Sequence, residues 1–183
     1  MCIRDRGRTV DQSSAKPGRA LFEKETAGAY LYKHFNIIIK KKGIDYPQIS
    51  STEELNRISL DQDYSSSDQA KHESREVWSL NSSRQARTII NPRVSKIAKS
   101  LLERSAQLVA CQVAGILLLR QAQDQNDKKN SDMVFNMEGS LFWKGNGYKE
   151  TVDQTVEQLT AEDNVKFVEI KDSAILGAAK LVA

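Results

Sequence analysis

The segment Met133-Val-Phe-Asn-Met-Glu-Gly-Ser140 places apolar, β-branched and aromatic residues directly before a glycine turn. This pattern predicts a short strand over Met133–Met137, bounded by Gly139. A second apolar run predicts a strand at Val165–Ile170, and the residues from Gly147 to Leu159 between the two strands have the spacing of an amphipathic helix. Because helices and strands alternate in this way, we expect an α/β fold.

A long helix is predicted before this α/β segment. Asn91-Pro92 is a typical helix start, with proline at the first helical position, and the composition stays helical from Arg93 to about Gln123. Its run from Leu108 to Leu119 is apolar except at Gln112, and it is shorter than the roughly 18 residues that a membrane span needs. We therefore expect a buried core helix and no membrane span.

The N-terminal part of the chain is predicted to be helical as well. Turn residues at Asp11–Ser14 and Pro17-Gly18 precede a run from Arg19 to Lys42 that has the spacing of one helix. Its three final lysines, followed by Gly43, are typical of a solvated helix end rather than a phosphate-binding patch. The prediction is completed by loops and short helices over residues 44–68 and by further helices at Ala70–Leu80 and Ala174–Val182.

The composition excludes several classes of protein. The chain has 183 residues, long enough for one globular unit, and its 27 Lys and Arg against 24 Asp and Glu give a net charge of only +3. Mixed charge of this kind argues against a dedicated binder of nucleic acid or of membrane surfaces. The two cysteines, Cys2 and Cys111, and the two histidines, His34 and His72, are isolated in the sequence, so we expect neither a disulfide scaffold nor a structural zinc site.

The first six residues differ in character from the rest. Met1–Arg6 has neither the apolar core of a signal peptide nor the length of a transit peptide, and it resembles read-through of a sequencing adapter. We therefore expect residues 1–6 to be a non-native leader, with the native sequence in residues 7–183, and we expect a cytoplasmic protein.

Three positions are candidates for chemistry, although the sequence has no Gly-rich phosphate loop, Gly-x-Ser-x-Gly, His-Glu-x-x-His or Cys-x-x-Cys motif. Glu23 is either a first-turn carboxylate that the helix dipole favours or a charged acceptor for a ligand hydroxyl. Thr52 is either a helix N-cap or a ligand contact. The Gly139 turn is either a simple connection or backbone beside a nucleotide, because nucleotides lie at the carboxyl ends of strands in α/β sheets.

Five segments, in order, resemble the C-terminal part of the hexokinase and glucokinase family. They are Val10 to Gly18 followed by Leu21-Phe-Glu-Lys24 and Gly28-x-Tyr30, the threonine-bearing stretch from Thr52 to Asp61, Arg104-Ser-Ala-Gln-Leu108, Gly139-Ser-Leu-Phe142, and Asp172 to Ala179. Together they cover almost the whole chain from Val10 onward.

The resemblance implies a fold, an activity and residue roles. It implies an α/β, helix-rich part of an actin-like ATPase lobe of the ribonuclease H-like type, in an enzyme that transfers the γ-phosphoryl group of ATP, with Mg²⁺, to the 6-hydroxyl of glucose or a similar hexose. Glu23 matches the family glutamate that accepts hydrogen bonds from sugar hydroxyls. Gly28, Thr52, Gly139 and Ser140 match positions that line the ATP site.

The sequence also departs from the family pattern. Ala20 stands where a sugar-contacting glutamine often occurs, Ser59 and Glu138 replace acidic family residues, and Asp172 to Ala179 is a degraded form of the family ending. No residue matches the family's aspartate base or its Gly-rich phosphate segments, which belong to the N-terminal half.

We therefore expect a C-terminal fragment of a sugar kinase that is inactive alone and has no catalytic base or metal ligand of its own. Two alternatives stay open: a catalytically dead regulatory homologue, and a non-enzymatic helical interaction protein that uses the long helix after Asn91 to bind a partner.

Overall fold

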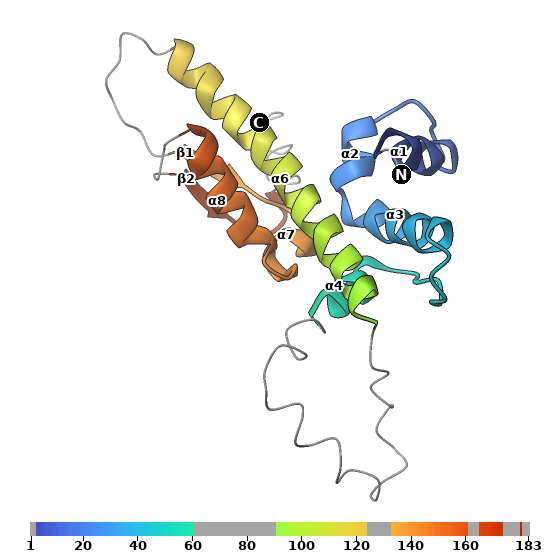
Figure 1. Cartoon of the computed structure of the whole chain (residues 1–183). Helices are drawn as coiled ribbons and strands as arrows, with labels where there is room; N and C mark the ends of the chain where they lie inside the picture. Colours follow the sequence, from blue (N-terminus) through green and yellow to red (C-terminus); the bar gives the residue numbers. More distant parts are fainter. Residues whose placement is uncertain (1–2, 61–90, 124–132, 161–164, 174–179, 181–183) are drawn as a thin grey trace, which may run out of the picture. The chain divides into compact units, whose positions relative to one another are not determined.

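The computed structural model describes residues 3–60, 91–123, 133–160, 165–173 and 180 (Figure 1). The chain divides into two compact units, residues 1–106 and residues 107–183, called unit 1 and unit 2 below. The boundary falls within the long helix α6. The elements are α1 (Ile3–Gln12), α2 (Leu21–Thr26), α3 (Gly28–Lys41), α4 (Thr52–Leu60), α6 (Pro92–Gln123), β1 (Met133–Asn136), α7 (Ser140–Lys144), α8 (Tyr148–Thr160) and β2 (Val165–Val168).

Unit 1 is helical in the part of it that the structure describes. Helix α1 packs against α2 and α3, and α3 packs against α4. The ring of Phe35, on α3, is fully buried and meets Tyr46 edge to face at 6.0 Å. Other buried aliphatic side chains of unit 1 come from α1, α3, α4 and the first half of α6: Val10, Leu31, Leu55, Val94 and Leu102.

The predicted single helix from Arg19 to Lys42 is wrong. The chain forms α2 and α3, separated at Ala27, whose backbone is extended (φ −74°, ψ 142°). The reason is that side chains from elsewhere satisfy the last carbonyls of α2. The carbonyl of Lys24 lies 2.8 Å from His34 Nε2, and that of Thr26 accepts a hydrogen bond from Ser105 Oγ.

Helix α1 was not predicted. Residues that were assigned to a leader and to a turn form a helix whose buried face includes Val10 and Arg6. The hydroxyls of Thr9 and Ser13 donate hydrogen bonds to the carbonyls of Asp5 and Val10 in this helix. Polar side chains that are typical of a turn can therefore lie in or beside a helix here, because the helix backbone satisfies their hydroxyls.

Helix α6 begins at Pro92, as predicted, and Asn91 Oδ1 caps it by accepting the N–H of Arg93 at 2.9 Å. The prediction of a buried apolar segment is only partly correct. A helix buries one stripe, here Ala110, Val113 and Leu117, while Ile116, Leu118 and Leu119 are 46–61% exposed. By length and composition, α6 is the one described helix that could also cross a membrane.

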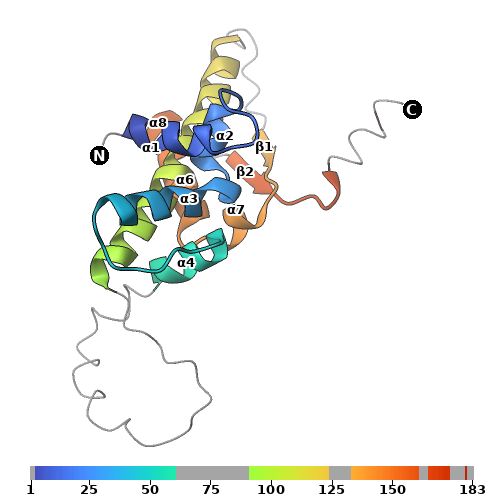
Figure 2. The same cartoon turned by 90° about the vertical axis from the view of Figure 1, so that its right-hand side faces the viewer.

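Unit 2 has the predicted α/β pattern. Strands β1 and β2 are parallel, with Met133 opposite Val165 and Asn136 opposite Val168, and they lie side by side in both views (Figures 1 and 2). Helices α7 and α8 form the connection that two parallel strands require. Strand β2 ends two residues earlier than predicted, and the short helix α7, which was not predicted, follows the Gly139 turn.

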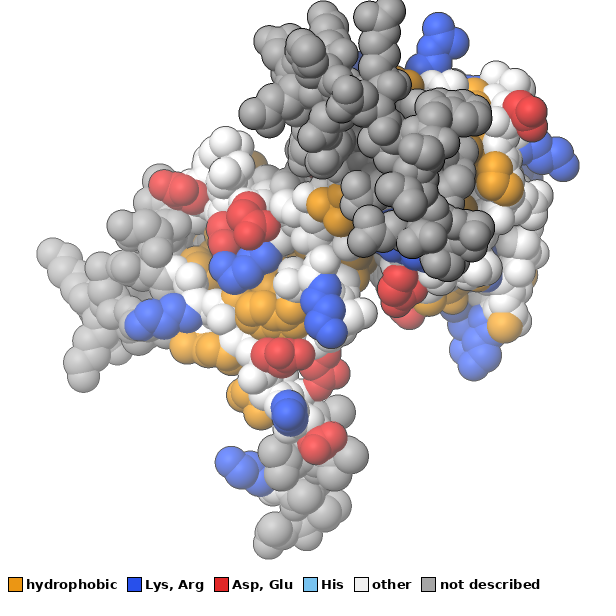
Figure 3. All heavy atoms as spheres, turned by 90° about the horizontal axis from the view of Figure 1, so that it is seen from below, with side chains coloured by type: hydrophobic (Ala, Val, Ile, Leu, Met, Phe, Trp, Pro, Cys, Tyr) orange, Lys and Arg blue, Asp and Glu red, His pale blue; other side chains and the backbone are white. Residues whose placement is uncertain are grey.

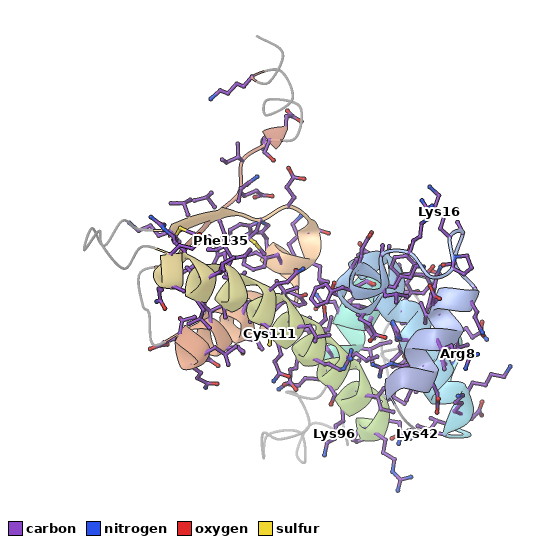
Figure 4. The ribbon with its side chains drawn as sticks, turned by 90° about the horizontal axis from the view of Figure 1, so that it is seen from above. Arg8, Lys16, Lys42, Lys96, Cys111 and Phe135 are labelled. Atoms are coloured by element: carbon purple, nitrogen blue, oxygen red, sulfur yellow. The ribbon has the colours of Figure 1, made fainter. Side chains whose placement is uncertain are left out.

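An aromatic cluster forms the core of unit 2. Phe142, 4% exposed, meets Trp143 at 4.9 Å, Phe167 at 5.3 Å and Tyr148 at 6.4 Å between ring centres. Phe135, on β1 (Figure 4), extends the cluster to Phe167 at 6.0 Å. The cluster therefore joins both strands, α7 and the start of α8.

Among the described residues, the surface carries charges of both signs interspersed with apolar side chains, as Figure 3 shows for one face. Cys111, near the middle of α6 (Figure 4), is exposed. The helix predicted at Ala70–Leu80 lies outside the described residues, as does most of the one predicted at Ala174–Val182.

Candidate functional site

Glu23 lies in the first turn of α2, a helix of only six residues, and its side chain is exposed. The sequence LFEKET gives this helix three consecutive charged residues, Glu23, Lys24 and Glu25. Lys24 and Glu25 form ion pairs with other elements of the unit, whereas the carboxylate of Glu23 is exposed to solvent.

Lys24 ties α2 to the preceding loop. Its ammonium donates to Asp11 Oδ1 at 2.6 Å and to the carbonyl of Lys16 at 2.7 Å, and the side chain is 5% exposed. Asp11 also accepts the N–H of Gly18, at 2.9 and 3.0 Å. The hydrogen bond from Lys24 and then that from Gly18 lower the pKa of Asp11, which therefore stays ionised. This pair closes the Pro17-Gly18 turn against the start of α2.

Glu25 is bound to two arginines that lie far apart in the sequence. Its Oε2 atom accepts a hydrogen bond from Arg104 Nη1 at 2.7 Å and lies 3.7 Å from Arg6 Nη2. Arg6 is 7% exposed, and burial together with the neighbouring charge of Arg104 lowers its pKa. Glu25 is therefore a structural ion-pair residue that links α1, α2 and α6.

His34 is buried beneath α2. Its Nε2 atom lies 2.8 Å from the carbonyl of Lys24, so it carries the proton and donates it. Burial is the main cause that lowers the pKa of His34; the Lys24 carbonyl and Glu25 oppose the shift, while Arg6 and Arg104 add to it. The ring is therefore neutral at pH 7, and its Nδ1 atom is buried without a hydrogen-bond partner among the described residues.

Gly28 and Thr52, two of the predicted nucleotide-side residues, are in direct contact. The Thr52 hydroxyl, in the first turn of α4, donates a hydrogen bond to the carbonyl of Gly28, the first residue of α3. Thr52 is not the N-cap of α4. Ser51 Oγ accepts the N–H of Glu54 at 3.3 Å, and the Glu54 carboxylate accepts the N–H of Ser50 at 2.7 Å, which is a capping arrangement.

Gly139 and Ser140, the other two predicted residues, lie in unit 2 between β1 and α7. Gly139 has φ +104° and ψ 138°, a conformation open essentially to glycine alone, and nothing lies within 4 Å of the point where a Cβ would stand. Trp143 Nε1 donates to the carbonyl of Met137 at 3.0 Å, and the carboxylate of Glu138 accepts a hydrogen bond from Ser173. These two hydrogen bonds fix the residues just before Gly139, while the backbone at Gly139 itself carries no side chain and stays open.

The structure thus brings Gly28 and Thr52 together within unit 1, whereas Gly139 and Ser140 are neighbours in the sequence and belong to unit 2. Sequence reasoning missed Arg104 and Ser105 as supports of α2, because they lie 79 residues from their partners and no local pattern links them. Among the described residues, no group of three His, Cys, Asp or Glu could hold a metal ion.

Comparison with known proteins gives two results. A sequence model of one family, described as hexokinase, matches residues 6–183. A solved structure titled "Crystal structure of Hexokinase" superimposes with a TM-score of 0.63 at 16% sequence identity, which establishes a similar fold. That match covers 91% of this chain and 37% of the solved chain, so the chain spans little more than a third of that protein's length. No curated protein matches this chain.

Proposed function

The chain belongs to the hexokinase family, and we propose that it is the C-terminal part of the large lobe of a cytoplasmic sugar kinase with an actin-like ATPase fold. The complete enzyme would transfer the γ-phosphoryl group of ATP to the 6-hydroxyl of glucose or a similar hexose. Such a transfer depends on positioning and on charge stabilisation, which need groups from several parts of a chain. The 37% coverage of the solved hexokinase supports a further segment of the same enzyme that would supply them.

The observation that carries the proposal is the isolation of the Glu23 carboxylate. Lys24 and Glu25 are engaged by Asp11 and by Arg104, while Glu23 remains exposed on a helix that is anchored from several elements. An ionised carboxylate is a strong acceptor for hydroxyl groups, and a sugar presents several of them. Glu23 would therefore hold the hexose by accepting hydrogen bonds.

Gly28, Thr52, Gly139 and Ser140 are the proposed nucleotide-side residues. The open backbone at Gly139 fits close approach by a ligand, because no Cβ intervenes. The Thr52 hydroxyl, engaged by Gly28, would shape the nucleotide side by fixing the first turn of α3. Magnesium would supply charge neutralisation at the phosphates, but the described residues hold no cluster that fits it, so we assign no metal ligand to this chain.

The proposal predicts that the purified 183-residue chain does not phosphorylate glucose. Neither the base nor a phosphate-binding segment is matched in its sequence, and both positioning and electrostatic stabilisation would be lost without them. A coupled assay for glucose 6-phosphate checks this, with the complete kinase as the positive control. ATP-dependent formation of glucose 6-phosphate by the chain alone would contradict the proposal that the base and the phosphate-binding segments lie in another part of the enzyme. No product from the complete enzyme would favour a catalytically dead homologue.

A further inference from the structure

We propose that Ser105 and His34 are positioning residues that fix the backbone of α2 and thereby set the direction of the Glu23 carboxylate. The inference rests on the proposed role of Glu23 in holding a sugar. Their hydrogen bonds go to the carbonyls of Lys24 and Thr26, so both act through the helix that carries Glu23.

Helix α2 needs outside support. A helix of six residues lies far below the roughly 12–15 residues at which an isolated helix becomes marginally stable in water. The last carbonyls of a helix have no partner within it. In α2, the Glu23 carbonyl accepts the N–H of Ala27 at 2.7 Å, and the carbonyls after it need partners from elsewhere. Whatever satisfies the following carbonyls determines where this helix ends and which way it points.

Two buried side chains donate hydrogen bonds to carbonyls at the end of α2. Ser105 Oγ, on α6, donates to the carbonyl of Thr26 at 2.8 Å, and His34 Nε2, on α3, lies 2.8 Å from the carbonyl of Lys24. Ser105 is 0% exposed and His34 is 1% exposed, so water cannot replace either donor without opening the unit. The two bonds hold the main chain of α2 from two different helices.

The other anchors of α2 act differently. Asp11 and Arg104 bind the flexible ends of the Lys24 and Glu25 side chains, several bonds away from the main chain. Such contacts can keep α2 near its neighbours while allowing it to rotate. The hydrogen bonds to the carbonyls fix the peptide planes themselves, and therefore the Cα–Cβ direction of Glu23 one and three residues earlier.

Amide hydrogen exchange in the 183-residue chain tests whether α2 is held in this way. In Ser105→Ala, the Lys24 and Ala27 amides, which bond to Ala20 and Glu23, should exchange about tenfold faster, since a buried carbonyl loses its partner. Ser95→Ala is the matched control, because Ser95 is equally buried on the same helix but is not bonded to α2 in the structure. Equal exchange at these amides in both variants would overturn the inference.

His34 is tested by a conservative pair. His34→Leu removes the donor and should speed exchange of the same amides, while His34→Gln keeps an N–H at a similar position and should restore most of the protection. Equal protection in the Leu and Gln variants would show that the ring supports α2 only by filling space, and would contradict the positioning role.

The complete kinase then tests whether the position of α2 matters to the sugar. Ser105→Ala should raise the sugar KM about tenfold while leaving the ATP KM and kcat close to those of Ser95→Ala; a loss of folded enzyme alone would lower the apparent kcat instead. If Glu23→Gln raises the sugar KM and Ser105→Ala does not, the positioning role fails and the proposed function stands. If Glu23→Gln leaves the sugar KM unchanged, the proposed function itself fails.

Discussion

Replacing Phe142 with alanine is predicted to destabilise unit 2 by about 3–5 kcal/mol, the usual cost of truncating a buried phenylalanine. The ring is 4% exposed and lies at the centre of the aromatic cluster, in contact with Trp143, Tyr148 and Phe167. Each aromatic pair adds roughly 0.5–1.5 kcal/mol beyond the buried area, so a value in the upper part of the range is expected. Because Phe142 lies two residues after Ser140, the same change should loosen the Gly139 turn.

Urea unfolding measures this change. Trp143 fluorescence, in a Trp78→Phe background, reports directly on the cluster, because the Trp143 ring lies 4.9 Å from Phe142. Phe22→Ala is the matched control: Phe22 is 40% exposed, and its loss should lower the free energy of unfolding by less than about 1 kcal/mol. Similar losses in the two variants would refute the assignment of Phe142 as a core residue of unit 2.

Two further predictions concern the turn and the buried histidine. Gly139→Ala should cost about 1–3 kcal/mol of stability because of the φ of +104°, although nothing occupies the space that the methyl group would take. Gly115→Ala, in α6 and with equal space, should instead stabilise the chain by about 0.5–1 kcal/mol. Equal changes in the free energy of unfolding, measured in urea, would contradict the turn geometry. Because burial lowers the pKa of His34, the unfolded chain binds a proton at this residue more readily. The contribution of His34 to the free energy of unfolding should therefore be present above the unfolded pKa of about 6.5 and be lost as the pH drops below it. In His34→Gln that loss should be smaller, and an unchanged pH profile would show that His34 is not its source.

The local part of the fold could be predicted from sequence. Pro92 marks the start of α6, Gly147 precedes α8, and the apolar runs at Met133 and Val165 form the paired strands. These signals lie within a few residues of the feature that they determine, so pattern and propensity suffice.

The errors arose where distant residues decide the structure. Ala27 interrupts a helical pattern because Ser105 and His34 satisfy the preceding carbonyls, and Ser105 lies 79 residues away from its partner. The exposed side of α6 could not be distinguished from the buried side, because the run is apolar all round. Gly28 and Thr52 were proposed as nucleotide-side residues through the resemblance, and the contact between them depends on tertiary packing of α3 and α4.

The central claim is that Glu23 holds the sugar of a hexokinase-type kinase, and the sugar KM of the complete enzyme tests it most directly. Glu23→Gln keeps the size of the side chain but removes the charge, and should raise the sugar KM roughly tenfold to a hundredfold. Glu53→Gln, at an exposed first-turn carboxylate of α4 in the same unit, is the control and should leave the sugar KM unchanged. An equal sugar KM in the two variants would contradict the account.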